Sequence, residues 1–128
     1  MLYLDASAIV KLVRTEPESA ALVDVVRGEP ERVASSIAWT EVVRVTRRAR
    51  TSVDDAIAVL EGIDLIPADD GILRAAGQIE PTTLKTLDAI HVATALSVRE
   101  DLTAFVAYDD RLISAARRLG LAVRSPGR

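Results

Sequence analysis

Apolar residues follow two patterns along the chain: short uninterrupted runs and longer stretches with helical spacing. Such runs are typical of strands buried on both faces, whereas apolar residues three and four positions apart predict helices. We predict strands at residues 1–5, 32–36, 64–69, 102–109 and 121–126, and helices at 6–14, 17–28, 37–50, 52–63, 70–79, 87–101 and 110–120. The last residues, 125–128, are expected to be frayed.

Strands and helical segments alternate from one end of the chain to the other, without an internal repeat, a low-complexity tract or a linker. Strands separated by helices pair in parallel, and the connecting helices cover both faces of the sheet. A chain of 128 residues fits a single hydrophobic core. The sequence therefore predicts one α/β domain over residues 1–128, with a central parallel sheet of about five strands.

Composition limits the chemistry that the chain can perform. The absence of cysteine and the presence of a single histidine exclude disulfides and thiolate metal sites and argue against a zinc site. No apolar run approaches the roughly 20 residues that span a bilayer, and no signal peptide is recognisable, so we expect a cytoplasmic protein without a membrane partner. A net charge of −3 argues against a strongly basic surface for nucleic acid. Any metal ion would be a hard cation held by oxygen.

Two acidic residues stand at the ends of predicted strands. Asp5 closes the first apolar run, and Asp109 closes "TAFVAYD". All strands of a parallel sheet end at the same edge, where open α/β folds bind ligands, so these two carboxylates are expected to lie together. Each also stands where a helix begins, and capping of that helix is an equally good explanation for either residue alone.

Two further acidic residues lie on the apolar faces of predicted helices. Glu41 is four positions from both Ile37 and Val45, and Asp88 is four positions before Val92. Residues three and four apart share a helix face. Burying an ionised carboxylate without a partner is costly, so an arginine, a hydrogen-bond network or a cation must compensate. For either acid alone, a position at the rim of the core is an equally good explanation.

Together the four acids predict a metal site. If Asp5, Glu41, Asp88 and Asp109 converge, their repulsion raises their pKa values unless divalent cations neutralise them. Mg²⁺ or Mn²⁺ held by carboxylates and water suits the hydrolysis of phosphate esters, because the ion activates water and stabilises the leaving oxygen. The four acids are therefore the candidate catalytic and metal-binding residues.

Four segments resemble the PIN-domain nucleases. They are "LDASAIVKL", "IAWTEVVR", "LDAIHVATA" and "FVAYDDRLISAA", and each contains one of the four acids. The resemblance covers nearly the whole chain, keeps the acids in the family's order, and is greatest to the VapC-type toxins of bacterial toxin–antitoxin pairs. It implies a PIN-like three-layer α/β/α sandwich and an endoribonuclease dependent on Mg²⁺ or Mn²⁺ that hydrolyses RNA. It also implies a cognate VapB-type antitoxin and a homodimer, with Asp5, Glu41, Asp88 and Asp109 as the metal-binding acids.

Three other positions near the acids bear on this resemblance. Ser7 matches the family's small hydroxyl two residues after the first acid, which implies a hydrogen bond near the metal; capping of the helix is an equally good role. Two residues before the last acid the family often has Thr or Ser, whereas this chain has Ala107, so the surroundings of that acid are expected to differ. His91 is expected to be a satisfied core residue.

Basic residues near the acids are candidates for contacts with RNA phosphates. Arg44, Arg47 and Arg48 share one helix face by their spacing, and Arg111 stands beside the last acid. For the first three, a solvated helix end that complements the helix dipole is the simpler explanation.

Two other classes of function remain open from the sequence. A non-catalytic PIN-like module would bind RNA or a partner without turnover. A phosphoacceptor signalling domain has similar length and architecture, but it needs an acid pair after the first strand and a lysine after the last, and the only lysines are Lys11 and Lys85. The RNA target is not readable from these residues.

Overall fold

The computed structural model describes all 128 residues and contains five strands and seven helices. The strands are β1 (Leu2–Leu4), β2 (Arg32–Ser35), β3 (Asp64–Ile66), β4 (Ala104–Val106) and β5 (Val123–Arg124). The helices are α1 (Ala6–Val13), α2 (Ser19–Arg27), α3 (Ile37–Arg48), α4 (Val53–Glu61), α5 (Asp70–Ala76), α6 (Thr86–Ser97) and α7 (Asp110–Arg118). Every predicted element is present, although most are shorter than predicted; the helix predicted over 87–101 ends at Ser97 and is followed by a short 3₁₀ turn. None of the helices combines the length and the apolar character needed to cross a membrane.

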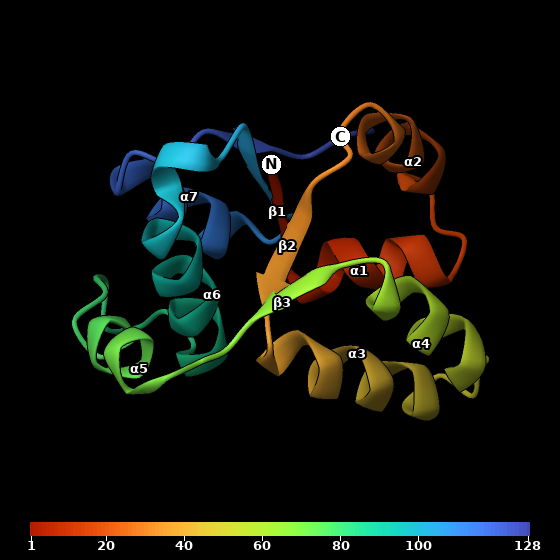
Figure 1. The fold of residues 1–128 in the computed structure, drawn as a ribbon, viewed down its shortest axis with the longest axis horizontal. Helices are drawn as coiled ribbons and strands as arrows, with labels where there is room; N and C mark the ends of the chain where they lie inside the picture. Colours follow the sequence, from red (N-terminus) through yellow and green to blue (C-terminus); the bar gives the residue numbers. More distant parts are fainter.

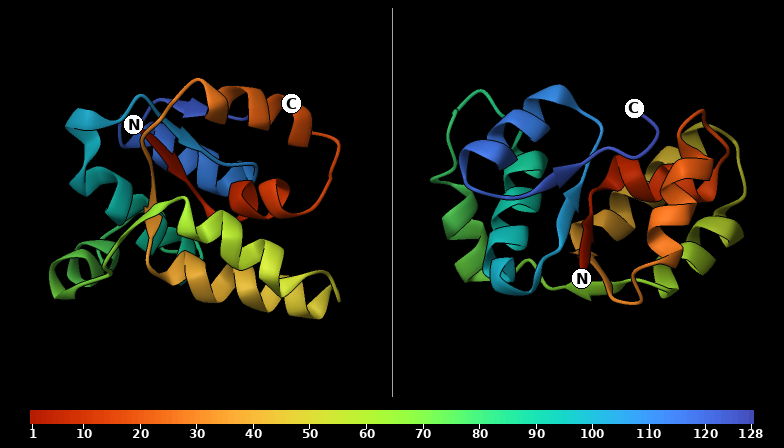
Figure 2. Two further views of the ribbon diagram at one scale, coloured as in Figure 1. Left: turned by 45° about the vertical axis from the view of Figure 1, so that its right-hand side comes forward. Right: turned by 90° about the horizontal axis from the view of Figure 1, so that it is seen from above.

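The five strands form one parallel sheet in the order β3-β2-β1-β4-β5 (Figure 1). In the central strand β1, Tyr3 pairs with Val33 of β2 and with Phe105 of β4. Side chains alternate between the faces of a strand, so Tyr3 and Phe105 pack in the core beneath α5, α6 and α7, whereas Leu2 and Leu4 pack in the core beneath α1 to α4 (Figure 2). The predicted α/β/α sandwich with a five-stranded parallel sheet is confirmed.

Polar side chains fix the start of four helices. Ser52 caps α4 by accepting a hydrogen bond from the backbone N of Asp55 at 3.2 Å. The other three caps are aspartates, Asp5 at α1, Asp69 at α5 and Asp109 at α7. Each of these three aspartates lies just beyond the end of a strand, so the turn that begins the helix also sets the direction of a carboxylate.

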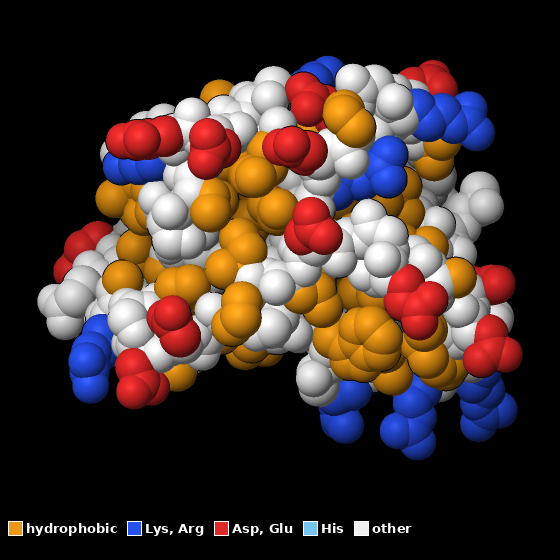
Figure 3. Space-filling view, in the orientation of Figure 1, with side chains coloured by type: hydrophobic (Ala, Val, Ile, Leu, Met, Phe, Trp, Pro, Cys, Tyr) orange, Lys and Arg blue, Asp and Glu red, His pale blue; other side chains and the backbone are white.

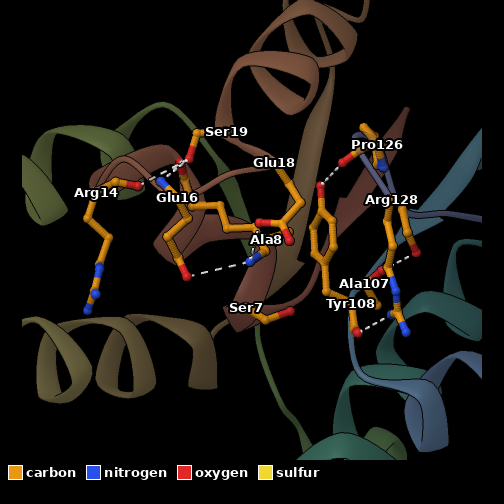
Figure 4. A network of polar contacts seen from close by, with 12 residues as sticks. Ser7, Ala8, Arg14, Glu16, Glu18, Ser19, Ala107, Tyr108, Pro126 and Arg128 are labelled. Atoms are coloured by element: carbon orange, nitrogen blue, oxygen red, sulfur yellow. Dashed lines mark hydrogen bonds and ion pairs between the residues drawn. The ribbon is translucent and has the colours of Figure 1, made fainter.

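The last residues of the chain pack against the loop after β4. Ser125 Oγ donates a hydrogen bond to the carbonyl of Ala107 at 2.6 Å, and Tyr108 Oη donates one to the carbonyl of Pro126 at 2.9 Å. The guanidinium of Arg128 reaches the carbonyl of Tyr108 in the same region (Figure 4). The expectation that residues 125–128 are frayed is therefore wrong, because these polar contacts hold a segment that carries no apolar pattern.

Candidate active site

One pocket at the carboxyl edge of the sheet is lined by all four acids singled out from the sequence. Asp5 directly follows β1, and Asp109 follows the neighbouring strand β4; Glu41 comes from α3 and Asp88 from α6. The pocket has a volume of about 450 Å³, and its other lining residues are Ala6, Ser7, Lys85, Thr86, Leu87 and His91. We call it the acid pocket. The structure thus places four carboxylates from distant parts of the chain around one pocket.

Asp5 is the most enclosed of these acids, with 4 % of its surface exposed. Its Oδ1 accepts a hydrogen bond from the backbone N of Ala8 at 2.8 Å, and the Ser7 hydroxyl donates to Oδ1 and Oδ2 at 2.7 and 2.9 Å. Burial raises the pKa of Asp5 from 3.8 to about 6, and the bonds from Ala8 and Ser7 oppose that shift. Asp5 therefore both caps α1 and lines the pocket, whereas Ser7 bonds the acid and does not cap the helix.

The other aspartates are more open. Asp88 is half-buried in the first turn of α6, and burial raises its pKa. Interaction with His91 opposes this shift, whereas the neighbouring charges of Asp109 and Glu41 add to it. Asp109 is exposed, and its Oδ1 accepts hydrogen bonds from two backbone N–H groups of α7 at 3.1 Å each. None of the four acids forms an ion pair with a lysine or an arginine; the only basic side chain in direct contact with one of them is His91.

Glu41 is bonded to His91. Oε1 of Glu41 lies 2.7 Å from Nε2 of His91, and Nδ1 of His91 lies 2.7 Å from Oη of Tyr3. His91 is 1 % exposed, which confirms the prediction of a satisfied core residue. The bond joins α3, on one face of the sheet, to α6, on the other face. Sequence reasoning did not anticipate this link.

The acid pocket offers carboxylate oxygens, which are the ligands that hard divalent cations prefer, but these oxygens are not closely gathered. No three acidic or histidine side chains converge tightly enough to hold an ion as the side chains now stand. Mg²⁺, however, keeps several of its waters and is often bound through only one or two carboxylates. Two of the carboxyl groups, those of Asp5 and Asp88, have raised pKa values and no basic partner, which a bound cation would relieve.

The candidate RNA-binding arginines divide into two groups. Arg44 and Arg48 line a second pocket, of about 470 Å³, that also includes Glu41 and Leu87 and therefore adjoins the acid pocket. Basic side chains protrude along the outer side of α3 (Figure 3). Arg47 lines neither pocket, and Arg111 lines a different depression beside α7. Of the candidate arginines, only Arg44 and Arg48 thus line a pocket that shares residues with the acid pocket.

Two polar residues of the acid pocket were missed by sequence reasoning. Lys85 and Thr86 stand at the start of α6, within one turn of Asp88, and both line the pocket. The spacing of three from Lys85 to Asp88 was the only available signal. Lys85 is exposed and has no carboxylate partner, so its ammonium group remains available to an anion that enters the pocket.

Residues 2–118 match the model of the PIN-domain family, and the chain belongs to that family. The resemblance drawn from the sequence is thereby confirmed. Among its relatives, Ribonuclease VapC46 of Mycobacterium tuberculosis is 44 % identical, over 98 % of this chain and 97 % of that protein. Ribonuclease VapC47 of the same species is 38 % identical, over 99 % and 98 %. The resemblance to VapC-type members is thus confirmed over nearly the full length of the chain.

Solved structures of low sequence identity share the fold. VapC20 of M. tuberculosis, described as a toxin that cleaves the sarcin–ricin loop, superposes with a TM-score of 0.76 at 13 % identity, covering 98 % of this chain and all of that chain. A toxin–antitoxin complex from Klebsiella pneumoniae has a chain that superposes with a TM-score of 0.74 at 19 % identity, covering 98 % of both chains. The three-layer architecture is therefore that of VapC structures.

Proposed function

We propose that this protein is an endoribonuclease that acts as the toxin of a toxin–antitoxin pair. The observation that carries the proposal is the acid pocket: four carboxylates from four distant segments line one cavity, and no lysine or arginine forms an ion pair with them. The two similar proteins named Ribonuclease VapC support the same activity. The family match leaves the phosphoacceptor alternative without support.

The four acids would hold Mg²⁺ or Mn²⁺. Hydrogen bonds from Ser7 and from the backbone at the start of α1 hold the carboxylate of Asp5 in place. Glu41, Asp88 and Asp109 line the same cavity. When bound, such a cation supplies an activated water and offsets the charge of the phosphate under attack. No side chain of the pocket needs to serve as nucleophile.

Basic side chains around the pocket would bind and orient the RNA backbone. Lys85 stands inside the acid pocket, and Arg44 and Arg48 stand in the adjoining one. Contacts of Lys and Arg with phosphates position a nucleic acid without reading its sequence. The arrangement therefore explains how an acidic protein could bind a polyanion: the basic residues lie beside the acids and not across the whole surface.

A cognate VapB-type antitoxin and a second copy of this chain are the proposed partners, and the cytoplasm the proposed location. Solved relatives with the same fold include the toxin–antitoxin complex from K. pneumoniae and a VapBC2 structure from Rickettsia felis bound to promoter DNA. These proteins support the existence of an antitoxin by analogy of fold. Size-exclusion chromatography with light scattering, with and without the antitoxin, tests both assemblies.

The central test is cleavage of RNA by the purified protein with added Mg²⁺ or Mn²⁺. The parent protein should cleave, and Asp5→Asn and Asp88→Asn should each abolish cleavage without unfolding the protein. Asp69→Asn is a matched control, because Asp69 caps α5 in the same manner as Asp5 caps α1 but lies outside the pocket. Equal cleavage by the parent and both site variants would exclude the proposal.

The wide spacing of the acids favours one rival, a PIN-like module that binds RNA without turnover. That module would bind RNA but show no metal-dependent cleavage. The same assay, run with a binding measurement in parallel, distinguishes the two functions.

A further inference from the structure

The only histidine of the chain stands in the middle of a hydrogen-bonded chain that leads from the sheet to the acid pocket. Nδ1 of His91 bonds Tyr3 Oη, and Nε2 bonds Oε1 of Glu41, each at 2.7 Å. The backbone N of Ser35 donates to Tyr3 Oη at 3.1 Å. Four groups from β1, β2, α3 and α6 are therefore connected in one line.

The hydrogen bond from Ser35 indicates a direction for the other hydrogen bonds of this line. Ser35 supplies an N–H, so the oxygen of Tyr3 accepts there and its own hydrogen is free for Nδ1 of His91. Burial raises the pKa of Tyr3 well above its usual value, and the phenol keeps that hydrogen. In the tautomer whose Nδ1 accepts that hydrogen, Nε2 carries the ring hydrogen and donates it to the carboxylate of Glu41.

Tyr3 and His91 are held by close packing in the core, whereas Glu41, at the end of the line, is more exposed. Tyr3 stacks on Phe105 of the neighbouring strand, with ring centroids 5.1 Å apart and planes within 8°, and it meets His91 edge to face at 79°. Both Tyr3 and His91 are almost fully buried. Glu41 has 21 % of its side chain exposed, and His91 is the only group that bonds its carboxylate. Without His91, nothing would hold this flexible side chain in one rotamer.

We propose that His91 is a positioning residue for Glu41, and that Tyr3 directs the hydrogen of the imidazole to Nε2. The pair holds Oε1 of Glu41, and Oε2 forms no hydrogen bond. The link also fastens α3 to α6 at the carboxyl edge of the sheet, where the two helix layers face each other across the pocket. Residues that orient a ligand or catalytic side chain in this way typically change activity about 10- to 100-fold when removed. The effect on cleavage rests on the proposed function, whereas the hydrogen-bonded line does not.

Nitrogen NMR of ¹⁵N-histidine-labelled protein tests the line without any substrate, because a single histidine gives one set of ring signals. In metal-free buffer near neutral pH, we expect a hydrogen on Nε2 and none on Nδ1. Glu41→Gln should shift the Nε2 signal, and Tyr3→Phe should shift the Nδ1 signal. Glu18→Gln, a change in a surface acid bonded to Lys11, serves as control and should move neither. A hydrogen on Nδ1, or an Nε2 signal unaffected by Glu41→Gln, overturns the proposal whether or not the protein cleaves RNA.

Cleavage kinetics with Mg²⁺ test the positioning role. His91→Leu should lower kcat about tenfold with little change in KM, and His91→Gln, which keeps a donor near the place of Nε2, should recover most of the loss. The loss caused by His91→Leu should disappear when Glu41 is already Gln, because positioning residues act only through the group they position. If His91→Leu fails to fold, Tyr3→Phe, which retains the stacked ring, takes its place. The decrease in kcat caused by Tyr3→Phe should likewise disappear when Glu41 is already Gln. The proposal is overturned if the decrease in kcat of a double variant equals the product of the decreases in its two single variants. Absence of cleavage in the parent protein instead refutes the proposed function and leaves the NMR result to decide the line.

Discussion

Replacing Asp5 by asparagine should stabilise the metal-free protein near neutral pH. The variant keeps the shape of the side chain and the oxygen that accepts from Ala8, and asparagine is as good a helix cap as aspartate. It removes a negative charge that is buried in the pocket without a basic partner. A residue required for the proposed activity is thus also a source of instability.

The size of the effect follows from the pKa. Burial raises the pKa of Asp5 from 3.8 to about 6, so the folded protein binds this proton more tightly than the unfolded chain does. The stability therefore falls as the pH rises from about 4 to about 6, and the full cost is present above that range. The shift corresponds to about 3 kcal/mol. The loss of one acceptor for the Ser7 hydroxyl offsets about 1 kcal/mol of the gain, so the variant should be more stable by about 2 kcal/mol above about pH 6.

Urea unfolding followed by circular dichroism, in buffer with a chelator, measures this difference. The gain in free energy of unfolding should be absent at about pH 4 and should grow to its full value above about pH 6. Asp69→Asn is the control, since Asp69 accepts the same type of cap bond from Ile72 at 2.9 Å but is exposed. Because Asp69 is exposed, its replacement relieves no burial cost, and the control variant should show no comparable gain in stability. The reasoning is refuted if Asp5→Asn is less stable than the parent near neutral pH, or if its effect is the same across the range.

Three further predictions concern the proposed reaction. Asp88→Asn should slow RNA cleavage by at least about 100-fold while leaving RNA binding nearly intact, as measured by single-turnover kinetics and fluorescence anisotropy; an unchanged rate would remove Asp88 from the site. Arg44→Ala and Arg48→Ala should each raise KM several-fold, whereas Arg47→Ala, on the same helix but outside both pockets, should not; equal effects of the three would point to general surface charge. Lys85→Ala should weaken the binding of uncleaved RNA, and the slope of log binding constant against log salt concentration should become shallower by about one, the value for one lost phosphate contact. An unaltered slope would contradict a contact between Lys85 and a phosphate.

The architecture was predictable because the strands differ from the helices in their apolar pattern. Aliphatic runs such as Leu2–Leu4 and Ala104–Val106 are buried throughout, as strands of a covered parallel sheet must be. Since such strands all end at one edge, Asp5 and Asp109 were expected to meet, and both line the acid pocket.

The start of α6 was harder to interpret. Every residue from Ala89 to Ala95 is buried, so the helix has no polar face whose period would indicate its orientation. Apart from the spacing of three between Lys85 and Asp88, the sequence therefore gave no sign that Lys85 and Thr86 face the pocket. The partner of His91 was hidden for a related reason, since a buried imidazole must have partners but the sequence does not say which side chains on other elements supply them.

The basic residues show a different limit of sequence reasoning. The spacing of Arg44, Arg47 and Arg48 correctly places them near one another on α3, but the pocket is narrower than that helix face. Which arginines border the pocket depends on Leu87, which comes from another helix and completes its wall. Contacts of this kind are set by the packing of the two layers and are not encoded in the spacing within one helix.

The central place of β1 in the sheet has a consequence for synthesis of the protein. Strand β1 must wait until residues 104–106 leave the ribosome before its second edge is paired, and Asp5 cannot meet Asp109 before then. A partly translated chain therefore lacks the complete set of carboxylates. If the protein is toxic to its own cell, the damage can begin only after Asp109 has been translated, which gives an antitoxin made beforehand time to intercept each new molecule.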